Sequence, residues 1–167
     1  MSIRVRAAGA GDAVDIAAIN REGQPGVSPL TADELDACLR RATLFRVAER
    51  GGAVEGYLIA FAPGFASIGD EYDWFSARHA SFLYVDQIAV ASSAWRSGVG
   101  AALYADLEGE ARARGIAQLV CEVNLRPENP RSLAFHARLG FAEAGQLEVR
   151  DGRRVALLER ALAQSPR

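Results

Sequence analysis

A glycine pair after an apolar segment is the first feature of this sequence that could do chemistry. Gly98-Val99-Gly100 follows the apolar stretch Ser81–Val90 and opens a helix expected over Val99–Arg114. The first turn of a helix presents N–H groups and partial positive charge, and glycine lets a phosphate group approach the backbone. Arg96 adds a guanidinium that can pair with phosphate oxygens. The segment is a candidate phosphate site, although a glycine pair here is about as often a packing or turn device. A dinucleotide fingerprint is disfavoured because Leu103 stands at its third glycine position.

A second segment places polar side chains on one face of a short helix. Asn129, Ser132 and His136 recur at helical spacing, and Leu139-Gly140-Phe141 follows them. Asn129 precedes Pro130, which is the pattern of a helix N-cap. A histidine titrates near neutral pH and can transfer a proton, and a histidine satisfied by a nearby carbonyl group or water is the structural alternative.

Two carboxylates stand inside apolar segments. Asp86 interrupts Ser81–Val90, and Glu122 lies in an expected strand over Ala117–Asn124. Burial disfavours the ionised form of a carboxyl group and raises its pKa toward values that suit a general base. Asp86 is therefore a candidate base, and Glu122 on the adjacent strand is a second candidate. An ion pair or a loop-anchoring hydrogen bond is the alternative for Asp86, and a water chain without a dedicated residue is the alternative for the base itself.

Composition excludes several classes of function. The chain of 167 residues fits one domain over 1–167, and a net charge of −2 argues against a nucleic-acid partner. All basic residues are Arg, which excludes a Schiff-base lysine and a P-loop. Two cysteines, Cys38 and Cys121, are too few for a disulfide framework, and no metal-ligand constellation is present. Without a long apolar run or a leader pattern, we expect no membrane contact and a cytoplasmic location.

The order of expected elements favours a mixed α+β fold, because a run of hairpins is followed by two strand-to-helix passages. Thr31 and Glu34 form a capping box, Asp12 is the expected cap of the first helix, and Pro63–His79 is expected to be irregular. The expected strands are Ile3–Ala7, Thr43–Glu49, Ala53–Phe61, Ser81–Val90, Ala117–Asn124, Phe141–Val149 and Arg153–Glu159. The expected helices are Asp12–Arg21, Thr31–Arg41, Val99–Arg114 and Pro130–Leu139.

These two motif segments together resemble the GNAT superfamily of acetyl-CoA-dependent N-acetyltransferases. The first resembles the family's Arg/Gln-X-X-Gly-X-Gly/Ala motif, and the second its Asn-X-X-Ala-X-X-Phe-Tyr-X-X-X-Gly-Phe hallmark. The sequence departs from both, because Trp95 holds the motif's first position and His136 stands where the family often has Tyr. The resemblance implies a largely antiparallel mixed sheet of about seven strands with about four helices, splayed between the fourth and fifth strands.

The resemblance also implies acetyl-CoA as co-substrate, without a metal. Pantetheine would enter between Phe82–Val90 and Ala117–Asn124, and the backbone at the start of the following helix would hold the diphosphate. The cofactor-binding residues so implied are Ile88, Ala89, Val90, Arg96, Ser97, Gly98, Val99, Gly100, Ala101, Asn129 and Ser132. A plain N-cap is the alternative for Asn129.

The reaction implied is direct attack of a primary amine on the thioester. A backbone N–H near Val90 would stabilise the oxyanion, His136 would give a proton to the departing thiolate, and Asp86 or Glu122 would act as base. Tyr72, Trp74 and Phe75 would wall the acceptor site among carboxylates that suit a cationic amine, with contributions from the Gly23–Pro29 loop; aromatics that cover the core are the alternative.

We expect a small-molecule acceptor and consider a homodimer through an exposed sheet edge possible. A catalytically silent acyl-CoA-binding regulatory module is the alternative function. A Ser-His-Asp hydrolase is disfavoured, because the chain has no Gly-X-Ser-X-Gly motif.

Overall fold

The computed structural model describes residues 1–163, which contain seven strands and five α-helices. The strands are β1 (Arg4–Ala7), β2 (Leu44–Arg50), β3 (Ala53–Phe61), β4 (Leu83–Val90), β5 (Gln118–Arg126), β6 (Ala142–Glu148) and β7 (Arg154–Ala161). The helices are α1 (Ala13–Gly23), α2 (Ala32–Arg41), α3 (Asp70–Ser76), α4 (Val99–Ala113) and α5 (Pro130–Arg138).

The strands form a mixed sheet in the order β1-β2-β3-β4-β5-β7-β6. Strands β4 and β5 run parallel, with Leu83–Val85 paired to Leu119–Cys121, whereas the other recorded pairs are antiparallel. The predicted α+β class and the strand number are confirmed. The predicted splay between β4 and β5 stays a prediction.

The chain divides into two compact units, and each is described here by itself. Unit 1 comprises Met1–Ala60 and Asp86–Leu107, and unit 2 comprises Phe61–Val85 and Glu108–Arg167. Both units include segments that are distant in sequence. A single domain over 1–167 stays a prediction.

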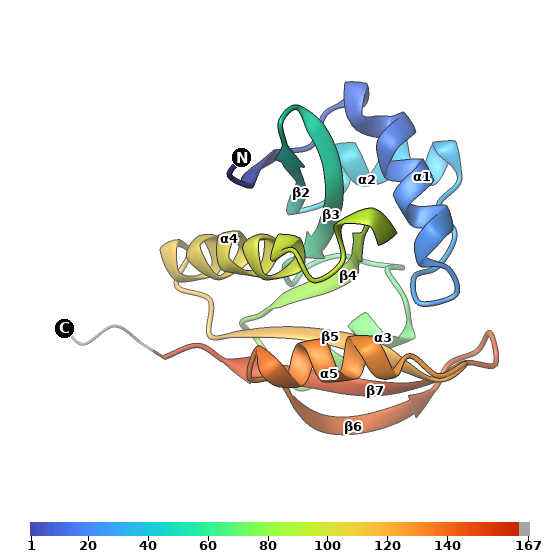
Figure 1. Cartoon of the computed structure of the whole chain (residues 1–167). Helices are drawn as coiled ribbons and strands as arrows, with labels where there is room; N and C mark the ends of the chain where they lie inside the picture. Colours follow the sequence, from blue (N-terminus) through green and yellow to red (C-terminus); the bar gives the residue numbers. More distant parts are fainter. Residues whose placement is uncertain (164–167) are drawn as a thin grey trace. The chain divides into compact units, whose positions relative to one another are not determined.

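Unit 1 is built on the antiparallel strands β1, β2 and β3 (Figure 1). Gly51 and Gly52 both have positive φ and make the tight turn between β2 and β3. On β3, Gly56 permits close approach of α4, because a Cβ there would lie 2.9 Å from Val99 Cγ1. The capping box predicted for α2 is confirmed: the Thr31 hydroxyl accepts from the Glu34 N–H, and the Glu34 carboxylate accepts from the Thr31 N–H.

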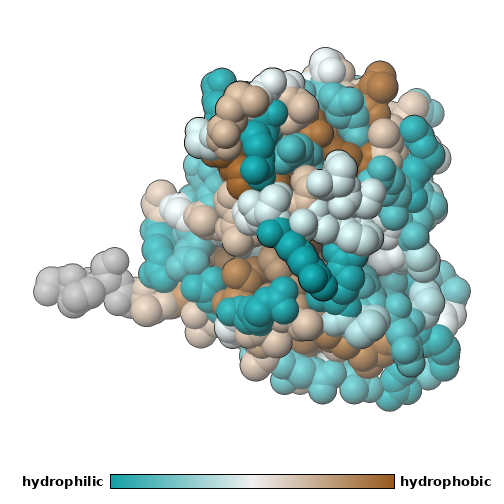
Figure 2. All heavy atoms as spheres, viewed as in Figure 1, coloured by the Kyte–Doolittle hydropathy of each residue, from teal (hydrophilic) through white to brown (hydrophobic). Residues whose placement is uncertain are grey.

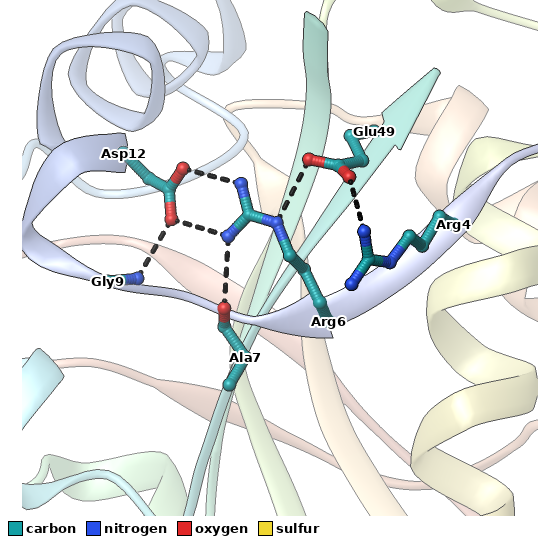
Figure 3. Close-up of polar contacts among 6 residues, drawn as sticks. All are labelled: Arg4, Arg6, Ala7, Gly9, Asp12 and Glu49. Carbon is teal, nitrogen blue, oxygen red and sulfur yellow. Dashed lines mark hydrogen bonds and ion pairs between the residues drawn. The ribbon is translucent and has the colours of Figure 1, made fainter. Parts of the chain in front are cut away.

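Asp12 does not cap α1, which corrects the sequence prediction. Its carboxylate accepts hydrogen bonds of 2.9 Å from both terminal nitrogens of Arg6 and one of 2.8 Å from the backbone N–H of Gly9 (Figure 3). The Arg6 Nε donates to Glu49 of β2, and the more exposed Arg4 reaches the same carboxylate. These hydrogen bonds lower the pKa of Asp12. The residue therefore joins β1 to a 3₁₀ turn over Ala10–Asp12 instead of serving the helix that follows.

Unit 2 contains β5, β7 and β6 side by side, and its core explains the one unpredicted helix (Figure 1). Helix α3 lies in the 63–79 stretch that was expected to be irregular. Its Tyr72 and Phe75 are fully buried, and both rings contact the Tyr84 ring. With α3 the helix number is five instead of about four. So short a helix depends on this tertiary packing, which local sequence patterns do not reveal.

Hydrophilic residues cover much of the face drawn in Figure 2, and hydrophobic residues come to the surface in separate patches. The most exposed large apolar side chains in the described part of the chain are Met1, Val14 and Trp95. None of the helices described is long and apolar enough to cross a membrane.

Candidate active site

The first turn of α4 presents backbone N–H groups to a prospective anion. Gly98 has φ +90°, a conformation that favours glycine, and the first bond of the helical ladder runs from the Ala102 N–H to the Gly98 carbonyl at 2.9 Å. The N–H groups of Val99, Gly100 and Ala101 therefore precede that ladder. Their position at the positive end of the helix suits a diphosphate.

The residues just before this turn differ in what they offer. Arg96 is exposed and has φ +63°. Ser97 turns its polar groups back into its own loop, because its N–H donates to the Ala94 carbonyl at 3.3 Å and its hydroxyl donates to the same oxygen. The predicted diphosphate contact of the Ser97 N–H would require this bond to open. Cofactor contacts at both residues stay predictions.

The end of β4, where pantetheine was expected to pair, is partly buried. Ala89 is buried, and Ile88 and Val90 are half-buried. The Val90 carbonyl accepts the Trp95 indole N–H at 2.9 Å, and the next N–H, of Ala91, donates to the Glu55 carbonyl at 2.8 Å. The peptide after Val90 is thus held on both sides.

Asp86 lies half-buried on β4 in unit 1. Burial raises the pKa of the Cys38 thiol on α2 to about 11, and the negative charge of Asp86 adds to that rise. Burial likewise raises the pKa of Tyr57 on β3, again with a smaller contribution from Asp86. The carboxylate of Asp86 is therefore near both groups, and its role as base stays a prediction.

A buried polar network holds the loop between α1 and α2. The Asn20 amide nitrogen donates to the Ser28 carbonyl at 2.9 Å and the Tyr57 hydroxyl at 3.0 Å, and it lies 3.2 Å from Gln87 Oε1. The Tyr57 hydroxyl donates to the same Gln87 oxygen at 2.7 Å. Neither Asn20 nor Gln87 was singled out from the sequence, although a polar residue in an apolar strand is a visible signal at Gln87.

In unit 2, Glu122 on β5 accepts a hydrogen bond of 2.6 Å from the Tyr84 hydroxyl on β4. Glu122 is half-buried, whereas Tyr84 is almost fully buried. The pairing register places Tyr84 beside Val120, so the bond is diagonal along the parallel pair. Both residues carry groups able to move a proton, and the base role of Glu122 stays a prediction.

His136 is buried on α5, between the rings of Phe135 and Phe141. Its Nδ1 lies 2.7 Å from the Ser132 carbonyl, so Nδ1 carries the proton and donates it there. Burial lowers the pKa of His136, and the bond to Ser132 opposes this only in part. The neutral imidazole with an unprotonated Nε2 is therefore the favoured state at neutral pH. The predicted acid role would require the imidazolium instead.

The other two predicted residues of α5 serve the helix itself. The Asn129 side chain accepts from the Ser132 N–H at 3.3 Å, which confirms the predicted N-cap. The Ser132 hydroxyl lies 3.2 Å from His136 Nδ1. Contacts of Asn129 and Ser132 with a cofactor stay predictions.

The aromatic residues expected to wall the acceptor site lie on α3. Tyr72 is 1% exposed and donates its hydroxyl to the Ala62 carbonyl, and Phe75 is 0% exposed, so both belong to the core of unit 2. Trp74 is half-buried: the Arg78 guanidinium lies 3.6 Å from its ring centroid, and a Cβ at Gly145 would meet the indole at 2.9 Å. This burial favours the alternative in which the aromatics cover the core, and a substrate role stays a prediction.

A buried ion pair beside α3 was not foreseen from the sequence. Arg153 donates to Glu71 at 2.9 Å, to Asn124 at 3.2 Å and to Asp151 at 2.8 Å. Glu71 is only 5% exposed, so Arg153 supplies the partner that a buried carboxylate requires. Glu71 and Asn124 lie 82 and 29 residues from Arg153 in sequence, so no local pattern indicates these two contacts. Within residues 1–163, no group of three His, Cys, Asp or Glu side chains could hold a metal ion.

Comparison with known proteins identifies the class that this fold and helix start define. The model of the acetyltransferase (GNAT) family matches residues 15–141. The chain therefore belongs to the GNAT acetyltransferase family, and the predicted resemblance is confirmed. A search of curated proteins finds no match.

Solved structures of similar fold cover nearly the whole chain. Ard1 from Thermoplasma volcanium is 17% identical with a TM-score of 0.80, covering 98% of this chain and 100% of its own. The ribosomal-protein-alanine N-acetyltransferase from Brucella melitensis is 23% identical with a TM-score of 0.71, covering 95% and 99%. The yncA protein from Salmonella typhimurium, solved with its cofactor acetyl-CoA, is 19% identical with a TM-score of 0.72, covering 100% and 98%. These similarities establish the fold.

Proposed function

We propose that this protein transfers the acetyl group of acetyl-CoA to a primary amine of a small molecule. One observation carries the proposal: the N–H groups of Val99, Gly100 and Ala101 precede the helical ladder, behind a glycine at φ +90°. Such a turn fits the diphosphate of coenzyme A, because it offers several donors and positive charge without a Cβ in the way. Family membership supports acetyl transfer as the reaction.

Acetyl-CoA would supply an activated thioester carbonyl. The amine nitrogen forms a bond to the carbonyl carbon while the carbon–sulfur bond breaks, the amine loses a proton, and the thiolate gains one. We assign the amine proton to Asp86 on β4, to Glu122 on β5, or to a water chain. His136 is our candidate donor to the thiolate, on the condition that its imidazolium form is populated.

Calorimetry with coenzyme A and acetyl-CoA, followed by labelled acetyl transfer to a panel of amines, tests the proposal. Because all basic side chains of the chain are Arg, no lysine amine of the protein can consume the label. We expect saturable binding and turnover with at least one small amine. Saturable binding without turnover on any amine would favour the catalytically silent acyl-CoA-binding module, and absence of binding by folded protein would refute both functions.

Variants separate the residue roles. His136→Phe should lower kcat mainly at acid pH, where the imidazolium is populated; an unchanged kcat at every pH would assign the thiolate proton to water. For Asp86→Asn and Glu122→Gln, kcat/KM is measured against pH and compared with the wild type. The fall of kcat/KM at acid pH reports protonation of the base. Loss of that fall in one variant alone identifies the residue, and its retention in both favours the water chain.

We also propose that residues 1–167 form one GNAT domain, and a homodimer through an exposed sheet edge is the assembly we would test first. Sedimentation across a range of protein concentrations distinguishes the dimer from a monomer.

A further inference from the structure

The loop between β4 and α4 is held at both ends by hydrogen bonds that involve its own Trp95 and two residues of the β2–β3 hairpin, Arg50 and Glu55. At its start, the Val90 carbonyl accepts the Trp95 indole N–H at 2.9 Å. The following N–H, of Ala91, donates to the Glu55 carbonyl on β3 at 2.8 Å. Because both polar groups of one peptide are bonded, its plane cannot rotate without breaking a hydrogen bond.

At its other end, the loop is held by an arginine from β2. Arg50 Nη2 reaches the Ser97 carbonyl at 3.4 Å, and Arg50 Nε donates to Glu55 Oε2 at 3.2 Å. The Arg50 and Glu55 side chains are each less than a third exposed. Glu55 thus contacts the start of the loop through its backbone and the end of the loop through Arg50.

These contacts connect the start of the loop at Val90 to its end at Ser97 through Glu55 and Arg50. We propose that Trp95, Arg50 and Glu55 are positioning residues that hold this loop in the conformation that receives the diphosphate of coenzyme A. The inference rests on the proposed function, since it concerns the same cofactor. It also gives a role to Trp95, which stands where the family motif has Arg or Gln.

The physical reason is preorganisation. Arg96 has φ +63°, a conformation that a residue other than glycine samples rarely without restraints. A diphosphate would bind donors that already converge, instead of ordering the loop on arrival. Loss of a restraint should therefore weaken coenzyme A binding even though none of the three side chains needs to touch the cofactor.

The test compares two acetyl donors: acetyl-CoA, which has the diphosphate, and S-acetylpantetheine, which lacks it. Wild-type binding of acetyl-CoA is measured first, so that failure of the proposed function is seen separately. Trp95→Phe removes the indole N–H and keeps an aromatic ring, and Arg50→Gln removes the contact with Ser97. Each is expected to weaken acetyl-CoA binding about five-fold, the effect of one hydrogen bond. The KM for S-acetylpantetheine, which has no diphosphate, should rise less than the dissociation constant of acetyl-CoA.

Two further variants keep the result interpretable. Glu55→Gln retains an oxygen that can accept from Arg50 Nε, and this variant should keep most of the wild-type affinity for acetyl-CoA. Arg4→Gln breaks a more exposed ion pair to Glu49 in the same unit and serves as the matched control. In the double variant of Trp95 and Arg50, the loss should be smaller than the product of the single losses, because both act on one loop.

Three outcomes would overturn the inference. Unchanged acetyl-CoA affinity in both single variants, with wild-type binding established, would show that the loop needs no such restraint. Equal losses for acetyl-CoA and S-acetylpantetheine would indicate a general loss of folded protein. Fully multiplicative losses in the double variant would show that the two side chains act independently.

Discussion

Replacement of Asn20 by Ala should destabilise the protein more than any other single change in its buried polar network. The Asn20 Oδ1 accepts from the Leu30 N–H at 3.1 Å and from Gln24 Nε2 at 3.0 Å, and its nitrogen donates to Ser28 and Tyr57. The side chain is only 1% exposed, so water cannot replace these bonds without entering the fold.

The magnitude follows from counting what loses a partner. Asn20 has two hydrogens and accepts two bonds, so the variant loses about four hydrogen bonds worth about 1 kcal/mol each. Gln87 reduces this loss, because it still accepts a hydrogen bond of 2.7 Å from the Tyr57 hydroxyl and donates one of 2.9 Å to the Ser28 carbonyl. We therefore expect a loss of about 3 kcal/mol in the free energy of unfolding.

Tyr57→Phe is the matched comparison. It removes one hydroxyl and its two hydrogen bonds, leaves Asn20 bonded to Ser28 and Leu30, and should cost about 2 kcal/mol. Urea denaturation followed by circular dichroism measures both, and equal slopes would show that the unfolded states are comparable. An Asn20→Ala loss no larger than that of Tyr57→Phe would refute the reasoning, since it would mean that the loop between α1 and α2 does not depend on Asn20.

Further predictions concern the glycine turn and two shifted pKa values. Gly98→Ala should weaken coenzyme A binding about ten-fold, because φ +90° costs a side chain roughly 1–2 kcal/mol, while Gly109→Ala in the exposed part of α4 should leave calorimetric affinity unchanged. Because the pKa of Asp12 is lower in the folded protein than in the unfolded chain, its ionised carboxylate stabilises the fold above the unfolded-state pKa of about 3.9. This stabilisation is lost as the pH falls through the lower pKa of the folded state. Asp12→Asn should therefore flatten the fall of the unfolding free energy at acid pH, measured by denaturation across pH. The pKa of His136 is also lowered by folding, so protonation of this residue reduces the unfolding free energy as the pH falls below about 6.5. His136→Phe should remove this part of the pH dependence. An unaltered slope of unfolding free energy against pH in the variant would contradict the burial argument.

Local patterns predicted the elements whose signals lie within a few residues. The capping box at Thr31 and the N-cap at Asn129 need only a side chain and a backbone N–H three residues later, and both are present. Asp12 carries a similar signal, but Arg6 offers two stronger charge-assisted bonds and takes its carboxylate.

Contacts between distant segments could not be predicted in this way. The pair of Arg153 and Glu71 spans 82 residues, and Arg50 reaches Ser97 across 47. Helix α3 belongs to the same class, because its formation depends on burial of Tyr72 and Phe75. The residue types at the candidate site were readable from the sequence, whereas the protonation state of His136 follows only from its burial.

The two tryptophans differ in exposure, so intrinsic fluorescence can distinguish them. Trp74 is packed under Arg78, whereas Trp95 is 47% exposed just before the first turn of α4. An indole in contact with water emits at longer wavelength than a buried one, and a Trp74→Phe protein would carry a single tryptophan, Trp95, in the proposed cofactor loop. Titration of that protein with coenzyme A would then follow occupancy of the loop directly, without a label.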